Sequence, residues 1–312
     1  MRDQVQTILK RASKECVYTK RGGGLITPSR AGYPLLTQVL ELLVLPKLPS
    51  PESAERLSFN SRMSIAQGYV YESALYDELC DKYGEDNVKY QVPTKYGCDL
   101  QGTADFVVTT EDEIIVIDAK AVNVDTKREL LERKIGNDNW SYRTQLAIYV
   151  QAMRVKEDKR NNESNRRKVR GEWYCWSPGA KKQWVVKLPN EEVQSLVFGA
   201  MWRVNELAKI KIAMEDGDFF KAVELACQRA DELILPKSFF YGRPCASTSF
   251  HYNPYSELFF YDITADDEDT DDGFPIETEL LKQVTLKLML DGRDGVMLPY
   301  EEYLAELNAT FS

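Results

Sequence analysis

The sequence has few of the residues that build imidazole or thiolate sites. Its 312 residues include one histidine, His251, which argues against a histidine-rich metal site and would have to serve any Ser/His/Asp or Cys/His arrangement alone. The six cysteines are scattered and form no CxxC pair, whereas disulfide frameworks and zinc sites use closer spacing. We therefore expect reduced thiols in a cytoplasmic protein.

Long apolar runs are missing as well. The longest candidate, LLVL at 42–45, is far shorter than the roughly 20 residues of a membrane-spanning helix. The N-terminal stretch MRDQVQTILKRASKEC lacks the apolar core of a secretory signal. These absences predict a protein that is neither exported nor bound to a membrane.

The charges are divided unevenly along the chain. Residues 1–190 contain 30 Lys and Arg against 25 Asp and Glu, while residues 191–312 contain 10 against 24. The basic excess is sharpest at 156–170, with seven basic and three acidic residues, and the strongest acidic run is DDEDTDD at 266–272. Such an asymmetry is informative about partners, although the basic stretch alone is also typical of a solvated loop.

The apolar pattern predicts a mixed α/β fold. We expect strands at 88–94, 102–110, 113–122, 172–176 and 183–188, because these runs are rich in β-branched residues and separated by turn residues. The expected helices cover about 2–14, 33–45, 62–83, 139–157, 190–214, 218–233, 276–290 and 299–308. A helix, three strands, a helix and two further strands form the central order.

One predicted hairpin, GTADFVVTTEDEIIVIDAK at 102–120, carries charges that a buried strand does not need. Because side chains alternate across a strand, Asp118 and Lys120 share one face, and Ile115, Ile117 and Ala119 share the other. If the two strands pair, Asp105 lies near Asp118, and two adjacent carboxylates repel each other. Mg²⁺ would satisfy them; an Asp118–Lys120 surface ion pair is the plainer alternative.

The elements around this hairpin strengthen the metal-site interpretation. The preceding helix contains GYVYE at 68–72, and the following helix contains QLAIY at 145–149. With Asp105 and the DAK of 118–120 between them, this order resembles the PD-(D/E)XK nuclease superfamily, in particular its RecB-like and lambda-exonuclease-like branch with a QxxxY motif. The resemblance covers about residues 25–190.

This resemblance implies a restriction-endonuclease-like core, a mixed central sheet flanked by helices, with extra N- and C-terminal helical segments. It implies that Lys120 is the catalytic lysine and that Gln145 and Tyr149 support the site or hold the DNA backbone. The implied metal ligands are Glu72, Asp105, Asp118 and the carbonyl of Ala119, with Mg²⁺ as the ion and Mn²⁺ able to replace it.

The sequence departs from the family pattern in two places. Ala104 stands where the superfamily name has proline, which leaves the neighbouring ligand in place. Some relatives hold an iron–sulfur cluster with four cysteines, but Tyr33 stands where the first of these is expected here, and no closely spaced C-terminal trio exists. We therefore expect no such cluster.

A nucleic-acid substrate should be held through its phosphates by Lys and Arg. The candidates are Arg62, Lys127, Arg143, Arg166 and Arg167. Trp140, Tyr142, Trp173 and Trp176 could stack on unpaired bases, although packing in the core is the commoner role of such residues.

We expect residues 1–235 to form a nuclease domain, with a catalytic core at about 62–190, and residues 236–312 to form an acidic extension packed on it or linked to it. The expected activity is metal-dependent hydrolysis of DNA phosphodiester bonds, by an exonuclease or end-processing enzyme of recombination, repair or phage DNA metabolism. A structure-specific or restriction-like endonuclease is the second possibility, and a non-catalytic DNA-binding or assembly protein the third. A recombinase, a single-strand-binding protein or a helicase would be a fitting partner, in a bacterial or phage-infected cytoplasm, and the sequence leaves the oligomeric state open.

Overall fold

The computed structural model describes residues 26–44, 59–97, 100–121, 140–159, 166–177, 179–230, 234–235, 245–246, 278–295, 298 and 302. The chain divides into two compact units, one of residues 1–32, 50–135 and 141–200, and one of residues 33–49, 136–140 and 201–312. Each is described by itself. The predicted division of the chain at residue 235 stays a prediction.

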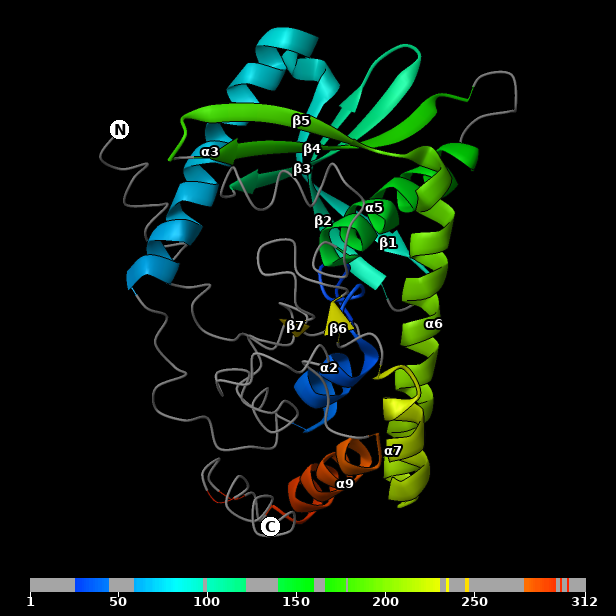
Figure 1. The fold of residues 1–312 in the computed structure, drawn as a ribbon. Coiled ribbons are helices and arrows are strands. Elements are labelled where there is room, and N and C mark those ends of the chain that lie inside the picture. The colour runs from blue at the N-terminus through cyan, green and yellow to red at the C-terminus, as the bar shows by residue number, and fades with distance from the viewer. Residues whose placement is uncertain are drawn as a thin grey trace, which may run out of the picture. The chain divides into compact units, whose positions relative to one another are not determined.

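The first unit is built on a mixed five-stranded sheet in the order β1-β2-β3-β4-β5. Its strands are β1 Val88–Tyr96, β2 Leu100–Thr109, β3 Glu113–Ala121, β4 Lys168–Ser177 and β5 Lys182–Leu188. Neighbours run antiparallel except β3 and β4, which are parallel. A parallel pair needs a long crossover, and helix α5, Trp140–Asp158, lies within this one (Figure 1).

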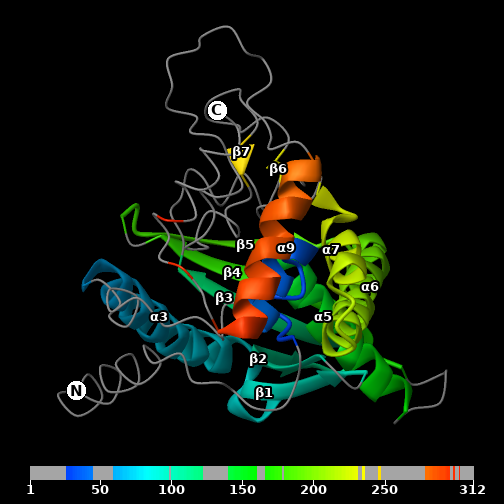
Figure 2. The same ribbon diagram turned by 90° about the horizontal axis from the view of Figure 1, so that it is seen from below.

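Two helices cover opposite faces of the sheet (Figures 1 and 2). Helix α3, Phe59–Tyr83, packs Tyr71, Leu75 and Leu79 against one face of the sheet. The strand residues that it contacts there alternate along β2 and β3, because successive side chains of a strand point to opposite faces. The strand residues of this core cluster are Val88, Phe106, Val108, Ile115, Ile117 and Tyr174. Helix α5 lies on the other face, so close that a Cβ at Gly171 would come within 2.9 Å of Leu146 Cγ.

The described residues of the second unit form helices and a two-stranded sheet of β6 Ile234–Leu235 and β7 Cys245–Ala246. Helix α2, Leu35–Val39, continues into a π-helical turn, η1 Leu40–Val44. Helix α7, Phe219–Cys227, packs against α2 and against α9, Thr278–Asp294. Asp218 caps α7 by accepting a hydrogen bond from the backbone N–H of Lys221 at 3.2 Å. Helix α6, Asn190–Glu215, begins in the first unit and ends in the second.

The predicted fold class is confirmed: an α/β protein with a mixed sheet, flanking helices and extra helices. The short 3-10 turn η4, Glu85–Asn87, joins α3 to β1. Two predicted helices differ in their course, since that of 33–45 changes to π-helical at Leu40 and that of 218–233 ends at Cys227. The helix predicted at 2–14 and the acidic run 266–272 lie outside the described residues, as does the helix at 299–308 apart from residue 302. Within the described part of the chain, no helix combines the length and apolar character that crossing a membrane would need.

Candidate active site

The two hairpin aspartates meet where β2 and β3 run side by side. Phe106 pairs with Ile117 and Val107 with Val116, so the same register carries Asp105 to a position opposite Asp118. The side chain of Asp105 reaches across the strands, and its Oδ2 accepts a hydrogen bond from the backbone N–H of Ala119 at 2.8 Å. The predicted proximity of the two carboxylates is therefore present in the fold.

Lys120 is held against Asp118. Its Nζ donates a hydrogen bond to Asp118 Oδ1 at 3.0 Å and lies 2.9 Å from Oδ2. Asp118 is fully buried at 0 % exposure, whereas the Lys120 side chain keeps 17 % of its surface open. The described residues offer no hydrogen bond to Asp118 Oδ2, so this buried oxygen has the ammonium charge beside it and no donor aimed at it.

The crowding of charges shows in the pKa values of the three groups. Burial, and then the charge of Asp118, raises the pKa of Asp105 to about 8, although Lys120 and the Ala119 N–H oppose the change. Burial also raises the pKa of Asp118 against the effect of Lys120. Burial alone would lower the pKa of Lys120, but the carboxylates of Asp118 and Asp105 hold it above its ordinary value. An Asp105 carboxyl whose pKa is raised to about 8 holds a proton at neutral pH while no cation is bound beside it.

These residues fit a divalent cation. Two carboxylates that repel each other, one of them with an oxygen that accepts no hydrogen bond, form a hard oxygen site of the kind that Mg²⁺ occupies while keeping several of its waters. Among the described residues no three His, Cys, Asp or Glu side chains stand close enough together to hold a metal ion. The carboxylates in place are thus two, Asp105 and Asp118, and the remaining ligands would be water, substrate oxygens or a side chain that moves.

Glu72, the third predicted carboxylate ligand, is turned toward strand β1. Its Oε2 accepts hydrogen bonds from Tyr90 Oη at 3.1 Å and from Gln91 Nε2 at 3.4 Å. Its charge still raises the pKa of Asp105, so it stands within electrostatic range of the pair. Its assignment as a metal ligand stays a prediction.

Tyr90 and Gln91, which hydrogen-bond to Glu72, were not expected beside the candidate site from the sequence. Strand pairing with β2 is present at Tyr90 and again at Val92 but not at Gln91, which has a φ of 50°. A residue other than glycine at positive φ is uncommon and costs about 1–3 kcal/mol, and such positions cluster at functional sites. The sequence VKYQVPT did not indicate this break. Its alternation of apolar and polar residues predicts a strand, but it does not predict the φ angle of a single residue.

The two residues of the predicted QxxxY pair lie together on α5. Gln145 Nε2 donates a hydrogen bond to Tyr149 Oη at 3.3 Å. Burial raises the pKa of Tyr149 to about 12, and the charges of Asp118 and Asp105 add to the shift, which places this hydroxyl in the field of the carboxylate pair. A Cβ at Gly102 would come within 3.1 Å of the same oxygen, so a glycine in β2 lets Tyr149 approach the sheet. A supporting role for both residues stays a prediction.

Tyr142 is a further neighbour of Lys120. Its ring lies under the ammonium, with Nζ 4.9 Å from the ring centroid, a geometry that attracts the cation to the ring face. Tyr142, predicted to stack on bases or to pack in the core, thus also contacts the predicted catalytic lysine. The spacing of three residues between Tyr142 and Gln145 could have indicated that both share the sheet-facing side of α5.

The residues predicted to contact DNA differ in exposure and in their ion-pair partners. Arg143 is 5 % exposed and forms an ion pair with Glu192 over the Trp173 ring, so its contact with DNA stays a prediction that this buried pairing does not favour. Arg166 is exposed and pairs with Asp158 at 3.2 Å. Arg167 lies in the same loop, half-buried. The side chain of Arg62 and the whole of Lys127 lie outside the described residues.

Comparison with known proteins yields distant structural likenesses. No family model matches the sequence. No curated protein matches it. The structure resembles one titled "Crystal structure of SSO0001", with 15% identity, a TM-score of 0.38 and coverage of 64% of this chain and 84% of that one. It also resembles an alkaline exonuclease, LHK-Exo, from Laribacter hongkongensis, with 11% identity, a TM-score of 0.36 and coverage of 62% and 93%. Structural similarity of this degree concerns only the general path of the chain and does not assign a role to any residue.

Proposed function

We propose that this protein is a metal-dependent nuclease that hydrolyses phosphodiester bonds of DNA. The observation that carries the proposal is the juxtaposition of Asp105 and Asp118 with Lys120 on one face of the β2–β3 pair. Burying two carboxylates beside each other is unfavourable unless cationic groups join them, and one ammonium neutralises one of the two. A site that is left incomplete in this way is suited to a divalent cation.

Each residue has a task in this reaction. A divalent cation at Asp105 and Asp118 would polarise a phosphoryl oxygen and lower the pKa of a bound water. Lys120 is partly open to solvent, so its ammonium can donate to a phosphate oxygen or to the attacking water and stabilise the charge that develops there. Tyr142 limits the directions that this ammonium can take.

A purely structural ion pair is the alternative for Asp118 and Lys120. It would leave Asp105 unexplained, because a strand residue whose pKa is raised to about 8 by burial and by its neighbour Asp118 weakens the metal-free fold at neutral pH. A destabilising group is kept at a functional site more readily than in a structural one. This difference favours a site over a structural pair.

The finer assignment is an exonuclease or end-processing enzyme that uses Mg²⁺. Its support is the resemblance of Glu72, Asp105, Asp118, Lys120 and the Gln145–Tyr149 pair to the lambda-exonuclease-like branch. An endonuclease is the second candidate, and a DNA-binding or assembly protein without activity is the third. The presence of all three acidic residues and the lysine speaks against the last of these.

One assay separates the three candidates. Purified protein with Mg²⁺ is incubated with linear and with covalently closed circular DNA, and Asp118→Asn serves as the matched inactive protein. Loss of linear DNA alone supports the exonuclease, and nicking of circles supports the endonuclease. Binding of DNA without hydrolysis in Mg²⁺ and in Mn²⁺ would overturn the nuclease proposal.

A further inference from the structure

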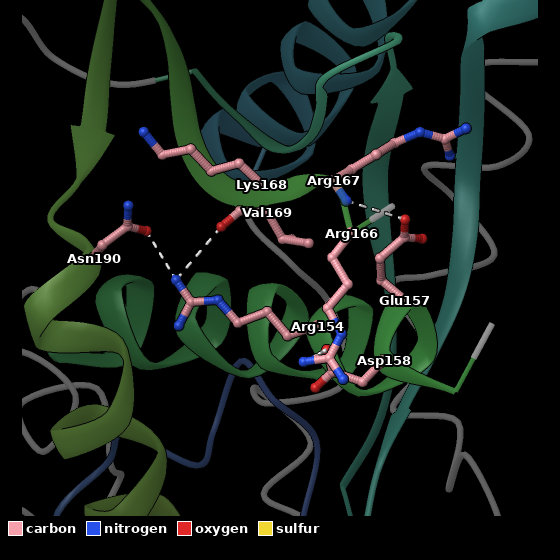
Figure 3. A pocket seen from close by; sticks show the side chains of 8 residues that line it. All are labelled: Arg154, Glu157, Asp158, Arg166, Arg167, Lys168, Val169 and Asn190. Carbon is pink, nitrogen blue, oxygen red and sulfur yellow. Dashed lines mark hydrogen bonds and ion pairs between the residues drawn. The ribbon is translucent and has the colours of Figure 1, made fainter. Parts of the chain in front are cut away.

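A second charged site lies at the far end of helix α5. There α5 ends, β4 begins and α6 begins, and they enclose a pocket of about 290 Å³ (Figure 3). Four basic side chains line it against two acidic ones, and the basic residues are Arg154, Arg166, Arg167 and Lys168. The pocket therefore carries an excess of positive charge.

Arg154 is the residue that indicates a ligand. Its guanidinium is half-buried and its Nη2 donates to two neutral oxygens, Asn190 Oδ1 at 2.8 Å and the carbonyl of Val169 at 3.4 Å (Figure 3). Within the described part of the chain, none of the ion pairs involves Arg154. Burial lowers its pKa. Charges taken out of water in proteins are normally paired, and the oxygens that Arg154 contacts are neutral, so an anion would supply the pairing.

The two acidic residues of the pocket contact its basic residues Arg166 and Arg167, and neither contacts Arg154. Asp158 Oδ1 lies 3.2 Å from Arg166 Nη1, and Glu157 Oε1 accepts from the backbone N–H of Arg167 at 3.4 Å (Figure 3). Asn190 is the first residue of α6, a helix of 26 residues. The N-terminal end of a helix carries partial positive charge and favours anions, so the helix adds to the potential that the basic side chains create.

We propose that this pocket binds a phosphate group. Arg154 has N–H groups beyond those on Nη2, and a guanidinium fork matches two phosphate oxygens. A volume of about 290 Å³ lies at the small end of the range of about 300–1,000 Å³ that is usual for ligand pockets, as a site for a small anion requires. Lys168 also lines the pocket and is exposed, so it adds positive charge there, whereas Arg166 is paired with Asp158.

The phosphate can come from two sources, the backbone of a DNA substrate or a free nucleotide. Lys168 pairs with Glu113, and Trp173 pairs with Asp118, so five residues of strand, about 17 Å, separate the pocket from the candidate active site along the sheet. That span corresponds to about five nucleotides of one DNA strand at roughly 3.4 Å each. The assignment to substrate DNA rests on the proposed nuclease function, whereas phosphate binding itself does not.

The first experiment measures phosphate binding directly. Inorganic phosphate and deoxyadenosine monophosphate are titrated by calorimetry in EDTA, with chloride at matched ionic strength as the reference anion. Arg154→Gln should weaken binding about tenfold or more, because it removes a charge-assisted pair. Lys187→Gln, which removes an exposed charge from β5 of the same unit, should bind as the unaltered protein does.

A second variant guards against loss of structure, since Arg154 also ties α5 to the Val169 carbonyl. Lys168→Gln leaves those hydrogen bonds in place and should weaken phosphate binding a few-fold. The proposal is overturned if phosphate shows no saturable binding beyond that of chloride, or if Arg154→Gln and Lys168→Gln both bind it unchanged.

Binding of DNA without metal then identifies the source. If Arg154→Gln and Lys168→Gln weaken the anisotropy signal of a labelled oligonucleotide and free phosphate competes with it, the pocket holds the DNA backbone. If DNA affinity is unchanged while mononucleotide binding is lost, the pocket takes a free nucleotide; both results support a phosphate site. Full hydrolysis by Asp118→Asn would refute the proposed active site and leave these binding results untouched.

Discussion

At the scale of single residues, the site is defined by an imbalance of charge. Asp105 and Asp118 share one lysine, and the pKa of each carboxyl is raised, with burial as the largest cause. A structural ion pair needs one carboxylate for one ammonium. Burying the second carboxyl beside it costs free energy of folding, and a purely structural role gives no reason for that cost. Predictions about the site therefore concern what happens when one member of this group is removed.

Asp118→Asn and Lys120→Met should each reduce DNA hydrolysis by about a hundredfold or more, as the loss of a group that stabilises the transition state does. The two variants should differ in metal affinity, because Asp118→Asn removes a ligand whereas Lys120→Met removes a competing cation. Calorimetric titration with Mn²⁺ distinguishes them. Near-normal hydrolysis by purified Asp118→Asn would exclude the assignment.

The stability of the metal-free protein should fall as pH rises. The pKa of Asp105 is raised from 3.8 to about 8 in the folded state, so between these values the folded state holds a proton that the unfolded state has lost. The unfolded state then binds fewer protons, and the free energy of unfolding decreases with pH across that window. Urea unfolding in EDTA at pH 5 and pH 8 should show this decrease.

Asp105→Asn should flatten this dependence and unfold at higher urea than the unaltered protein at pH 8. Asp112→Asn, an exposed residue of the β2–β3 turn, is the matched control and should keep the slope. A slope that persists in Asp105→Asn would assign the dependence to other groups.

The choice of metal is a further expectation at this scale. With carboxylate and carbonyl oxygens as ligands, Mg²⁺ and Mn²⁺ should support hydrolysis. Ca²⁺ should permit DNA binding but not turnover, because its longer and more variable coordination places water and phosphate poorly. Vigorous hydrolysis in excess EDTA would contradict a metal-dependent mechanism.

At the scale of elements, the sequence predicted what alternation and turn residues encode. The hairpin of β2 and β3 was predictable because Ile115 and Ile117 occupy one face while Asp118 and Lys120 occupy the other, and the register then brought Asp105 to Asp118. The hydrogen bonds from Tyr90 and Gln91 to Glu72 were not predictable, because they depend on a backbone dihedral angle and join side chains 18 and 19 positions apart. The buried pairing of Arg143 with Glu192 escaped the sequence for the same reason, since it joins residues 49 positions apart.

The break in β1 at Gln91 offers a test of stored strain. Gln91→Gly should relieve the cost of a φ of 50° and raise the free energy of unfolding by about 0.5–1 kcal/mol, the gain being limited by the greater chain entropy of glycine. It should also free Glu72 from one hydrogen bond and change metal affinity. Gln91→Asn, which tolerates positive φ better than Gln does, should relieve a smaller part of the same cost. Destabilisation by Gln91→Gly beyond that of Gln91→Ala would show that the amide of Gln91 matters more than its backbone.

At the scale of the whole molecule, the two parts of the sequence differ in the sign of their charge. The net charge of −9 combines a basic excess in residues 1–190 with an acidic excess in residues 191–312, and six of the seven residues at 266–272 are acidic. A DNA-binding protein with this composition must overcome repulsion from its own carboxylates, and repulsion of this kind acts over the Debye length of about 10 Å at 0.1 M salt and farther at lower salt. The acidic run is the feature of this chain that the nuclease resemblance does not explain.

Replacing the six acids of 266–272 with Ser and Asn should therefore tighten DNA binding at low salt, and the gain should shrink as salt rises because screening removes the repulsion. Fluorescence anisotropy in EDTA over a series of salt concentrations measures it, with Glu191→Gln and Asp216→Asn, exposed acids of α6 and its C-terminal turn, as a control for general loss of negative charge. If the control variant gains as much DNA affinity per charge removed as the variant of 266–272 does, the acidic run repels DNA no more than other acidic residues do. If neither variant changes affinity at low salt, the acidic half does not oppose DNA at all, and its charge is better matched to a basic protein partner.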